Sequence, residues 1–477
     1  MIKKENEISR VLDIFKEISS IPHGSGNMGK IADYCTDFAK KLALKYYRDN
    51  ADNVIIYKGA NMCDKDTPVI LQGHLDMVCQ KANDSNFDFL SDGIEIIDDG
   101  EYLRAPNTTL GADNGIAVAM ILSLLERYDI PHPPIEAVFT TDEEIGMIGA
   151  KKLDTAVLYG KKFINLDSEE DDTVTVSCAG GCDFKATLGI TRIVKNTTGI
   201  KIKLCGLKGG HSGVEINSHR VNADILAGRF LDYLSRHTDF DIVSIDGGDK
   251  PNAIPCQCTL VITSDNPEKA VEAINKCADI VKQEISFNEE SFYTDVSVLQ
   301  AKEYSVLDEN SKKELIFSLN CIPNGIMEMS SEIENLVETS LNLGVLSTDE
   351  NEIVFHSALR SSKQSSLDFL ENRLRLFFEK VTATVECFGH YPPWEYKSDS
   401  VLREIYLNTY TELFGITPKV EAIHAGLECA VFSSSIKGAD CIAIGPNIFD
   451  AHTVNERLQI SSVEKVYKLL LQILAEI

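Results

Sequence analysis

Residues 69–78 read VILQGHLDMV, an apolar run that ends in a histidine and an aspartate. The part from Val69 to Gln72 is typical of a short buried strand. Because side chains alternate along an extended chain, the two-residue spacing places His74 and Asp76 on one side of it. A carboxylate in that position can orient an imidazole that binds a metal. The same pair also occurs in purely structural roles, so the stretch predicts a strand and leaves its chemistry open.

Acidic residues recur beside other apolar segments. They are Asp113 before a helix expected over 115–126, Asp142 to Glu144 after a strand at 135–140, and Asp167 to Glu170 after a strand at 163–166. Each has an ordinary explanation alone, since an aspartate before a helix is commonly an N-cap and a run of acids is commonly a solvated loop. In a parallel sheet, however, the carboxyl ends of the strands meet in one crevice. Carboxylates gathered there need cations to offset their repulsion. The pattern therefore favours a site for divalent metal ions.

The order of the segments predicts an α/β fold, with a mostly parallel sheet and helices on both faces. After residues 178–182 the pattern changes to a mixture of strands and amphipathic helices, which continues to a proline pair before Trp394. A chain of 477 residues is also long for a single core. We therefore expect a catalytic domain made of residues 1–183 and 395–477, interrupted by an α+β lid domain at residues 184–394.

Composition excludes several classes of function. With 46 basic and 73 acidic residues, the formal net charge of -27 disfavours binding to nucleic acid or to anionic membranes. The apolar run at 116–125 is too short to span a bilayer, and the charged residues 1–5 do not resemble a secretion signal. The thirteen cysteines lack paired CxxC spacings and indicate reduced thiols, hence a cytoplasmic protein. Cys256 and Cys258 have a spacing that suits zinc poorly.

Nine motifs together resemble a known family, the co-catalytic zinc peptidases that include aminoacylase and carboxypeptidase G. They are GHLDMVCQK from Gly73, TLGADNGIA from Thr109, TTDEEIGMIGA from Thr140, NLDSEE from Asn165, GGHSG from Gly209, NAIP from Asn252, ALRSS from Ala358, HAGLEC from His424 and GPNIFDAHTVNERL from Gly445. They follow the family's order along nearly the whole chain. Within the family, the sequence is most similar to the aminoacyl-histidine dipeptidases, also called peptidase D.

The resemblance implies a centre with two divalent metal ions. Asp113 would bridge both ions, His74 and Asp167 would complete the ligands of one, and Glu144 and His452 those of the other. Zinc is the metal expected for such ligands, and manganese or cobalt would also be accepted.

The same resemblance implies the reaction. Glu143 would act as the general base toward the attacking water, and Asp76 would orient His74. The expected substrates are dipeptides, with Xaa-His (carnosine-like) dipeptides preferred within a broader range. An N-acyl amino acid deacylase or a metallo-carboxypeptidase would use the same metal chemistry and is the alternative. A non-catalytic protein that kept the fold is disfavoured because Glu143 is present.

Substrate contacts are expected mainly from the inserted domain. The resemblance implies that His211 steadies the oxyanion, that Asn252 helps to hold the substrate, and that Arg360 grips a free C-terminal carboxylate. Glu428 is a candidate partner for the substrate's amino group. Without the resemblance, a histidine between glycines would be an ordinary loop residue and a strand arginine an ordinary surface charge.

One stretch and one single residue depart from the pattern expected of the family. They are IPHGSGN at 21–27 and Asn455, where an acid is expected in relatives. Neither is a proposed metal ligand, so both bear on substrate fit. A homodimer is compatible with the sequence, which leaves open whether His211 acts in its own subunit or in its partner's.

Overall fold

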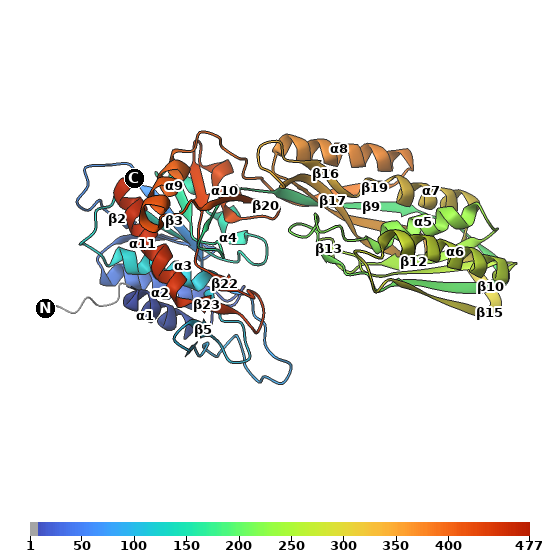
Figure 1. The fold of residues 1–477 in the computed structure, drawn as a ribbon, viewed down its shortest axis with the longest axis horizontal. Helices are drawn as coiled ribbons and strands as arrows, with labels where there is room; N and C mark the ends of the chain where they lie inside the picture. Colours follow the sequence, from blue (N-terminus) through green and yellow to red (C-terminus); the bar gives the residue numbers. More distant parts are fainter. Residues whose placement is uncertain (1–7) are drawn as a thin grey trace. The chain divides into compact units, whose positions relative to one another are not determined.

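The structure, a computed structural model, describes residues 8–477 (Figure 1). The charged segment at residues 1–5, on which the expectation about secretion rests, lies outside them. The chain divides into two compact units, here named the first unit and the second unit. Of the described residues, the first unit comprises 8–178, Trp394–Ala422 and Leu427–Ile477, and the second unit comprises Ala179–Pro393 and Ile423–Gly426.

An eight-stranded sheet forms the centre of the first unit. In spatial order its strands are β1 (Lys45–Arg48), β2 (Val54–Lys58), β6 (Ile135–Thr140), β3 (Val69–His74), β7 (Lys162–Asn165), β21 (Asp440–Ala443), β8 (Thr173–Cys178) and β20 (Lys419–Ile423). The four central strands β6, β3, β7 and β21 are parallel, whereas β1, β2 and β8 pair antiparallel. Every residue of β3 and β6 is buried, so both faces of the sheet are covered. The predicted α/β fold is confirmed, with its parallel part confined to the centre.

Helices cover this sheet. They are α1 (Ser9–Ser19), α2 (Gly29–Lys41), α3 (Ala112–Leu125), α4 (Ile148–Lys152), α9 (Val401–Phe414), α10 (Glu428–Ser435) and α11 (Ile460–Glu476). All but one of the residues of α3 are buried, as expected for a helix that is apolar on every side. A small sheet of β22 (Ile448–Phe449), β23 (Arg457–Gln459), β5 (Tyr102–Arg104) and β4 (Ile97–Asp98) carries the loop at residues 450–456.

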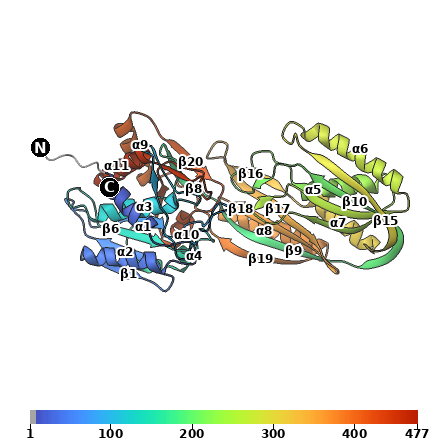
Figure 2. The same ribbon diagram turned by 90° about the horizontal axis from the view of Figure 1, so that it is seen from below.

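The second unit is built on a nine-stranded antiparallel sheet (Figure 2). Its strands run in the order β15 (Tyr293–Leu307), β10 (Arg192–Cys205), β14 (Cys258–Ser264), β12 (Asp241–Gly247), β17 (Val337–Thr348), β18 (Glu352–Ser361), β9 (Gly180–Gly189) and β19 (Thr384–Tyr391), with β16 (Gly325–Met329) paired to β17. A two-stranded ribbon joins β11 (Gly210–His211) to β13 (Ala253–Ile254).

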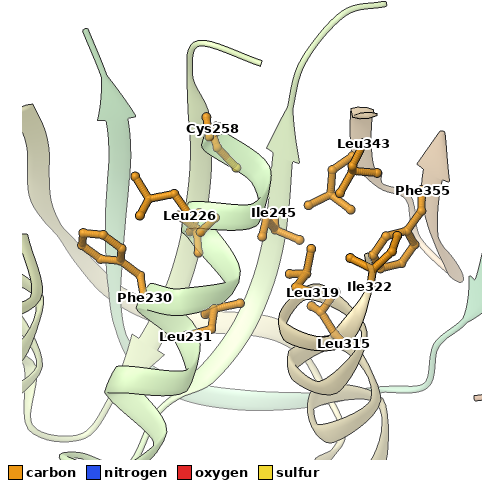
Figure 3. Close-up of a cluster of buried hydrophobic side chains, with 14 of the residues drawn as sticks. Leu226, Phe230, Leu231, Ile245, Cys258, Leu315, Leu319, Ile322, Leu343 and Phe355 are labelled. Carbon is orange, nitrogen blue, oxygen red and sulfur yellow. The ribbon is translucent and has the colours of Figure 1, made fainter. Parts of the chain in front are cut away.

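Four helices bury one face of that sheet: α5 (Ala223–Ser235), α6 (Pro267–Ile285), α7 (Glu309–Cys321) and α8 (Gln364–Lys380). Figure 3 shows Leu226 and Phe230 of α5 and Leu319 of α7 in one buried cluster that also contains strand residues such as Ile245 and Phe355. The burial of alternate strand residues is typical of an antiparallel sheet with one covered face. This unit therefore has the α+β character predicted for the insert. Among residues 8–477, no helix is long and apolar enough to cross a membrane.

Candidate metal centre and active site

Asp113 stands between two histidines near the start of α3. Its Oδ1 lies 3.1 Å from Nε2 of His74, and its Oδ2 lies 3.0 Å from Nε2 of His452. His74 is the buried last residue of β3, and His452 is a half-exposed residue in the loop between β22 and β23. Burial opposes ionisation of Asp113, but the two histidines outweigh it and hold the pKa of this carboxyl far below its ordinary value. One carboxylate thus presents each oxygen to a different imidazole.

Asp167 and Glu144 lie against the same two imidazoles. Oδ1 of Asp167 is 3.4 Å from Nε2 of His74, and Oε1 of Glu144 is 3.0 Å from Nε2 of His452. The second contact lacks hydrogen-bond alignment, so the buried Oε1 of Glu144 has no hydrogen-bond partner among the described residues. The ligand atoms of His74, Asp113 and Glu144 all lie within 4.8 Å of one another. The fold therefore brings the five residues predicted as metal ligands together in the first unit.

The cluster attracts positive charge. The carboxylates of Asp113 and Glu144 raise the pKa of His452 to about 11. Burial works against protonation of His74, yet Asp167 and Asp113 raise its pKa well above the ordinary value. Burial, with Asp113 and Glu144 nearby, raises the pKa of Asp167 to about 6. Three carboxylates and two imidazoles are donors that suit Zn²⁺, and Mn²⁺ or Co²⁺ as well, so the residues present fit divalent cations.

Asp76 positions both His74 and the loop that follows β6. The Nδ1 of His74 is 2.9 Å from the backbone carbonyl oxygen of Asp76 and 3.6 Å from its carboxylate, so the carbonyl is the nearer acceptor. The carboxylate of Asp76 accepts hydrogen bonds from Ser25 Oγ (2.8 Å) and from the backbone N–H groups of Glu143 (3.0 Å) and Glu144 (3.3 Å). With a proton on Nδ1, the Nε2 of His74 is left to act as a ligand.

Glu143, which is partly buried, and Glu428, which is fully buried, are two acids of the same centre. Burial raises the pKa of Glu143 well above its ordinary value, and burial raises that of Glu428 to about 8. Glu428 begins α10, where its Oε2 accepts hydrogen bonds from Gln72 Nε2 (2.5 Å) and Thr140 Oγ1 (2.7 Å). Its Oε1 is buried and has no partner among the described residues. Glu428 therefore lies in the first unit, among the ends of β3 and β6, and not on a surface.

Glu456 is a residue of this centre that sequence reasoning missed. Its carboxylate accepts hydrogen bonds from four successive backbone N–H groups: Leu110 (2.8 Å), Gly111 (3.1 Å), Ala112 (2.8 Å) and Asp113 (3.4 Å). Gly111 has φ +71°, and this left-handed conformation directs the four N–H groups toward the carboxylate of Glu456. Glu456 is next to Asn455, the position where an acid was expected, and an acid adjacent to the expected one was the available signal.

Asn114 was also missed. Its side-chain oxygen accepts a hydrogen bond from the backbone N–H of His74 (3.1 Å), and its amide donates one to the carbonyl of Leu166 (2.9 Å). It thereby links the end of β3 to the turn that carries Asp167. An asparagine beside an aspartate has no spacing that would reveal this bond.

In the second unit, His211 has a defined tautomer. The backbone N–H groups of Gly213 and Val214 both donate to its Nδ1 at 3.2 Å, so the proton of the neutral ring is on Nε2. Burial lowers the pKa of His211, and Arg360 contributes, which favours the neutral ring. Asn252 is exposed, and its backbone carbonyl accepts a hydrogen bond from the N–H of Ser212.

Arg360 is a buried arginine on β18, and His424 lies near it. The guanidinium of Arg360 donates to the hydroxyl of Tyr391 at 2.9 Å, while its Nε has no hydrogen-bond partner among the described residues. His424 pairs with Ser340 (Nε2 to Oγ 2.7 Å), and burial together with Arg360 lowers its pKa to about 3. A buried guanidinium with an unused N–H group is suited to an anionic group such as a carboxylate. His424 and Tyr391 were not singled out from the sequence.

Comparisons with known proteins agree with the α/β fold of the first unit and with its cluster of two histidines and three carboxylates. The chain belongs to peptidase family M20/M25/M40, whose family model matches residues 70–476. This membership confirms the resemblance seen in the motifs and the prediction that the chain is a metallopeptidase.

Two relatives match almost the full length at more than 30% identity. The chain is 36% identical over 470 residues to the cytosol non-specific dipeptidase of Escherichia coli (strain K12). The match covers 98% of this chain and 97% of the relative. The crystal structure of aminoacylhistidine dipeptidase from Vibrio alginolyticus is similar with a TM-score of 0.91, at 35% identity, and the match covers 99% of this chain and 98% of that one. Aminopeptidase PepT from Bacillus cereus, at 16% identity, a TM-score of 0.57 and 98% coverage of both chains, shares the fold alone.

Proposed function

We propose that the chain hydrolyses dipeptides with two divalent metal ions and prefers Xaa-His (carnosine-like) dipeptides within a broader range. The observation that carries this proposal is Asp113, whose two oxygens each face a different histidine. A carboxylate so placed can bridge two ions. The substrate class is supported by the two full-length relatives, one named a non-specific dipeptidase and the other an aminoacylhistidine dipeptidase.

The ligands divide into two sets that share Asp113. His74 and Asp167 would hold one ion, and Glu144 and His452 would hold the other. When bound, such a pair lowers the pKa of a water molecule toward neutrality and polarises the scissile carbonyl. Zinc is the metal we propose, and manganese and cobalt suit the same oxygen and nitrogen donors.

Glu143 would carry the proton in this reaction. It takes a proton from the attacking water and delivers it to the leaving amine. Its raised pKa suits this role, because a buried carboxylate binds a proton more strongly than an exposed one. The hydrogen bond from its N–H to Asp76 fixes the loop on which it sits.

The second unit would recognise the substrate as a lid domain, corresponding to residues 184–394. The Nε2–H of His211 would donate to the oxyanion, Arg360 would bind the free carboxylate, and the exposed Asn252 would contact the peptide. For Glu428 we propose a contact of Oε1 with the substrate's amino group. Since Glu428 is fully buried, that contact requires the side chains around it to move.

The test is a substrate panel with the metal-loaded protein. Equal concentrations of an Xaa-His dipeptide, other dipeptides, N-acyl amino acids and tripeptides are compared by the release of free amino acid. We expect dipeptides to have the highest kcat/KM, with Xaa-His first among them. Faster release from N-acyl amino acids would favour the deacylase, and faster trimming of longer peptides would favour the carboxypeptidase. A protein inactive on every substrate would refute the proposal.

A second experiment tests whether the chain forms a homodimer in which His211 serves the partner's centre. Glu143→Gln and His211→Ala are each expected to be nearly inactive. If His211 serves the partner's centre in a dimer, mixing the two variants restores up to about one quarter of the activity, because some mixed dimers hold one intact pair. If His211 serves its own subunit, the mixture stays inactive.

We also propose a cytoplasmic location. The thirteen cysteines are all free in the structure, as expected in a reducing compartment, and a full-length relative is named a cytosol dipeptidase.

A further inference from the structure

A second cluster of metal-ligating side chains lies in the second unit. Cys182 of β9, Glu371 of α8, and Cys387 and His390 of β19 have ligand atoms that all lie within 4.8 Å of one another. The two sulfur atoms are 3.1 Å apart, and Nε2 of His390 is 3.4 Å from Sγ of Cys387 and 3.2 Å from Oε2 of Glu371. None of these residues belongs to the centre around Asp113.

The backbone of β19 contains a bulge that assembles this cluster. Cys387 pairs with Phe184 of β9, but the register then shifts, so that Gly389 and His390 together lie opposite Cys182. Gly389 has φ +68°, the left-handed conformation that glycine adopts at the first position of such a bulge. Residues three apart on a regular strand point to opposite faces. The bulge instead places His390 and Cys387 on one face, together with Cys182.

Helix α8 adds the fourth ligand on that face. Phe378 of α8 stacks on Phe184, with ring centroids 6.0 Å apart, which fixes the helix against β9. Glu371 lies two turns earlier, and its two carboxylate oxygens have separate partners. Oε1 accepts a hydrogen bond from Arg375 (2.8 Å), which leaves Oε2 directed to His390. Figure 2 shows α8 beside β9 and β19, and β19 is the last strand of the sheet.

We propose that Cys182, Cys387, His390 and Glu371 bind one zinc ion. Tetrahedral zinc with bonds of about 2.0 to 2.3 Å has ligand atoms about 3.3 to 3.8 Å apart, and the three separations given above need to change by at most about 0.7 Å to reach these values. Sulfur and imidazole ligands select zinc over magnesium, calcium or manganese.

Charge and access agree with this assignment. Two thiolates and one carboxylate against Zn²⁺ leave one negative charge, which the neighbouring guanidinium of Arg375 balances. Zinc would bind both cysteines as thiolates, so binding of the ion releases their protons. The side chain of His390 is 51% exposed, which gives the ion a path from solvent.

The test uses Co²⁺ as a spectroscopic substitute for zinc in the reduced, chelator-treated full-length protein. Thiolate ligands give cobalt a near-ultraviolet charge-transfer band, whereas the centre around Asp113 has only oxygen and nitrogen donors. Because the centre around Asp113 also accepts two cobalt ions, we expect up to three cobalt ions per chain, of which one gives the band. The band should disappear when zinc is added, because zinc replaces cobalt at thiolate sites.

Variants then assign the band to residues. Cys182→Ser and Cys387→Ser should each at least halve it, because one thiolate remains, and the double variant should abolish it. Cys256→Ser, which removes an exposed thiol elsewhere, should leave it unchanged. His390→Asn alters a half-exposed residue and should preserve the fold while weakening cobalt binding about tenfold or more.

Three results would overturn the proposal. They are absence of the band in the reduced wild type, an undiminished band in Cys387→Ser, and unchanged cobalt affinity in His390→Asn. A Cys182–Cys387 disulfide in the native protein, found by mass spectrometry, together with no band after reduction, would assign the pair to redox chemistry instead.

Discussion

Replacing Glu456 by glutamine tests the geometry of the centre without touching a proposed ligand. The carboxylate accepts two backbone hydrogen bonds on Oε2, from Leu110 and Gly111, and two on Oε1, from Ala112 and Asp113. A glutamine amide keeps one accepting oxygen, so two bonds are lost and an NH₂ group faces two N–H donors. With about 1.5 to 3 kcal/mol for each hydrogen bond to a charged group, the loss is about 3 to 6 kcal/mol.

Part of this loss should appear as weaker metal binding, because the same segment carries the carboxylate of Asp113. If half of it does, affinity falls about tenfold to 100-fold, at 1.4 kcal/mol for each factor of ten. Titration with Mn²⁺, followed by electron paramagnetic resonance, measures this, since manganese disfavours the thiolates of Cys182 and Cys387. The remainder should lower the thermal unfolding midpoint of the metal-free protein.

The matched control for Glu456→Gln is the same substitution at Glu464, an exposed residue of α11. Glu464→Gln should leave the manganese affinity and the unfolding midpoint within error of the wild type. The reasoning is refuted if Glu456→Gln folds and binds manganese as tightly as the Glu464 control.

Four other outcomes are expected. Glu143→Gln should lower kcat by about 10²- to 10⁴-fold without lowering the thermal midpoint, because burial already opposes its charge; a loss below tenfold would contradict its role as base. Arg360→Lys should raise KM about tenfold for dipeptides but not for their C-terminal amides, and equal effects on both would remove the carboxylate contact. Chelation should abolish hydrolysis, and each restored ion should raise stability by about 2.7 kcal/mol at 100 times its Kd, seen as a higher thermal midpoint. Burial raises the pKa of Asp224 to about 8, so the folded state holds a proton that the unfolded state loses above about pH 4. Between about pH 4 and pH 8 the free energy of unfolding should therefore fall by about 1.4 kcal/mol per pH unit, and Asp224→Asn should flatten this slope in urea titrations at pH 5 and pH 8.

The parallel strands could be predicted because each is a continuous apolar run. β3, β6 and β7 are buried along nearly their whole length, so side-chain chemistry alone marks them in the sequence. The long strand β10 is harder to recognise from the sequence. Its first half, from Arg192, is mostly exposed and is held by pairing with β15, and pairing between distant strands leaves no local pattern.

Four of the candidate ligands adjoin predictable elements, and the family resemblance supplied His452, whereas the groups that hold the ligands could not be located. Glu456 binds a segment 343 to 346 residues earlier in the chain. Asn114 acts through its side-chain amide on the backbone of His74, and any asparagine could do so. A hydrogen bond to a backbone N–H or C=O group does not depend on which side chain that residue carries. The sequence of the bonded segment therefore does not reveal such a bond.

The cluster of Cys182, Glu371, Cys387 and His390 could not be predicted from the sequence either. Zinc motifs are recognised when ligands come in pairs at short spacing, and here Cys182 is separated from Cys387 by 205 residues. The short pair Cys387 and His390 would face opposite ways on a regular strand, so its spacing argues against a site. The bulge at Gly389 and the pairing of β9 with β19 bring these side chains together on one face, and neither is evident from the sequence. Gly389→Ala is a further change to the same geometry, because alanine disfavours φ +68° and its Cβ would lie 3.3 Å from Asp183 Oδ2. If the bulge is what assembles the ligands, this variant must weaken cobalt binding although every ligand is retained.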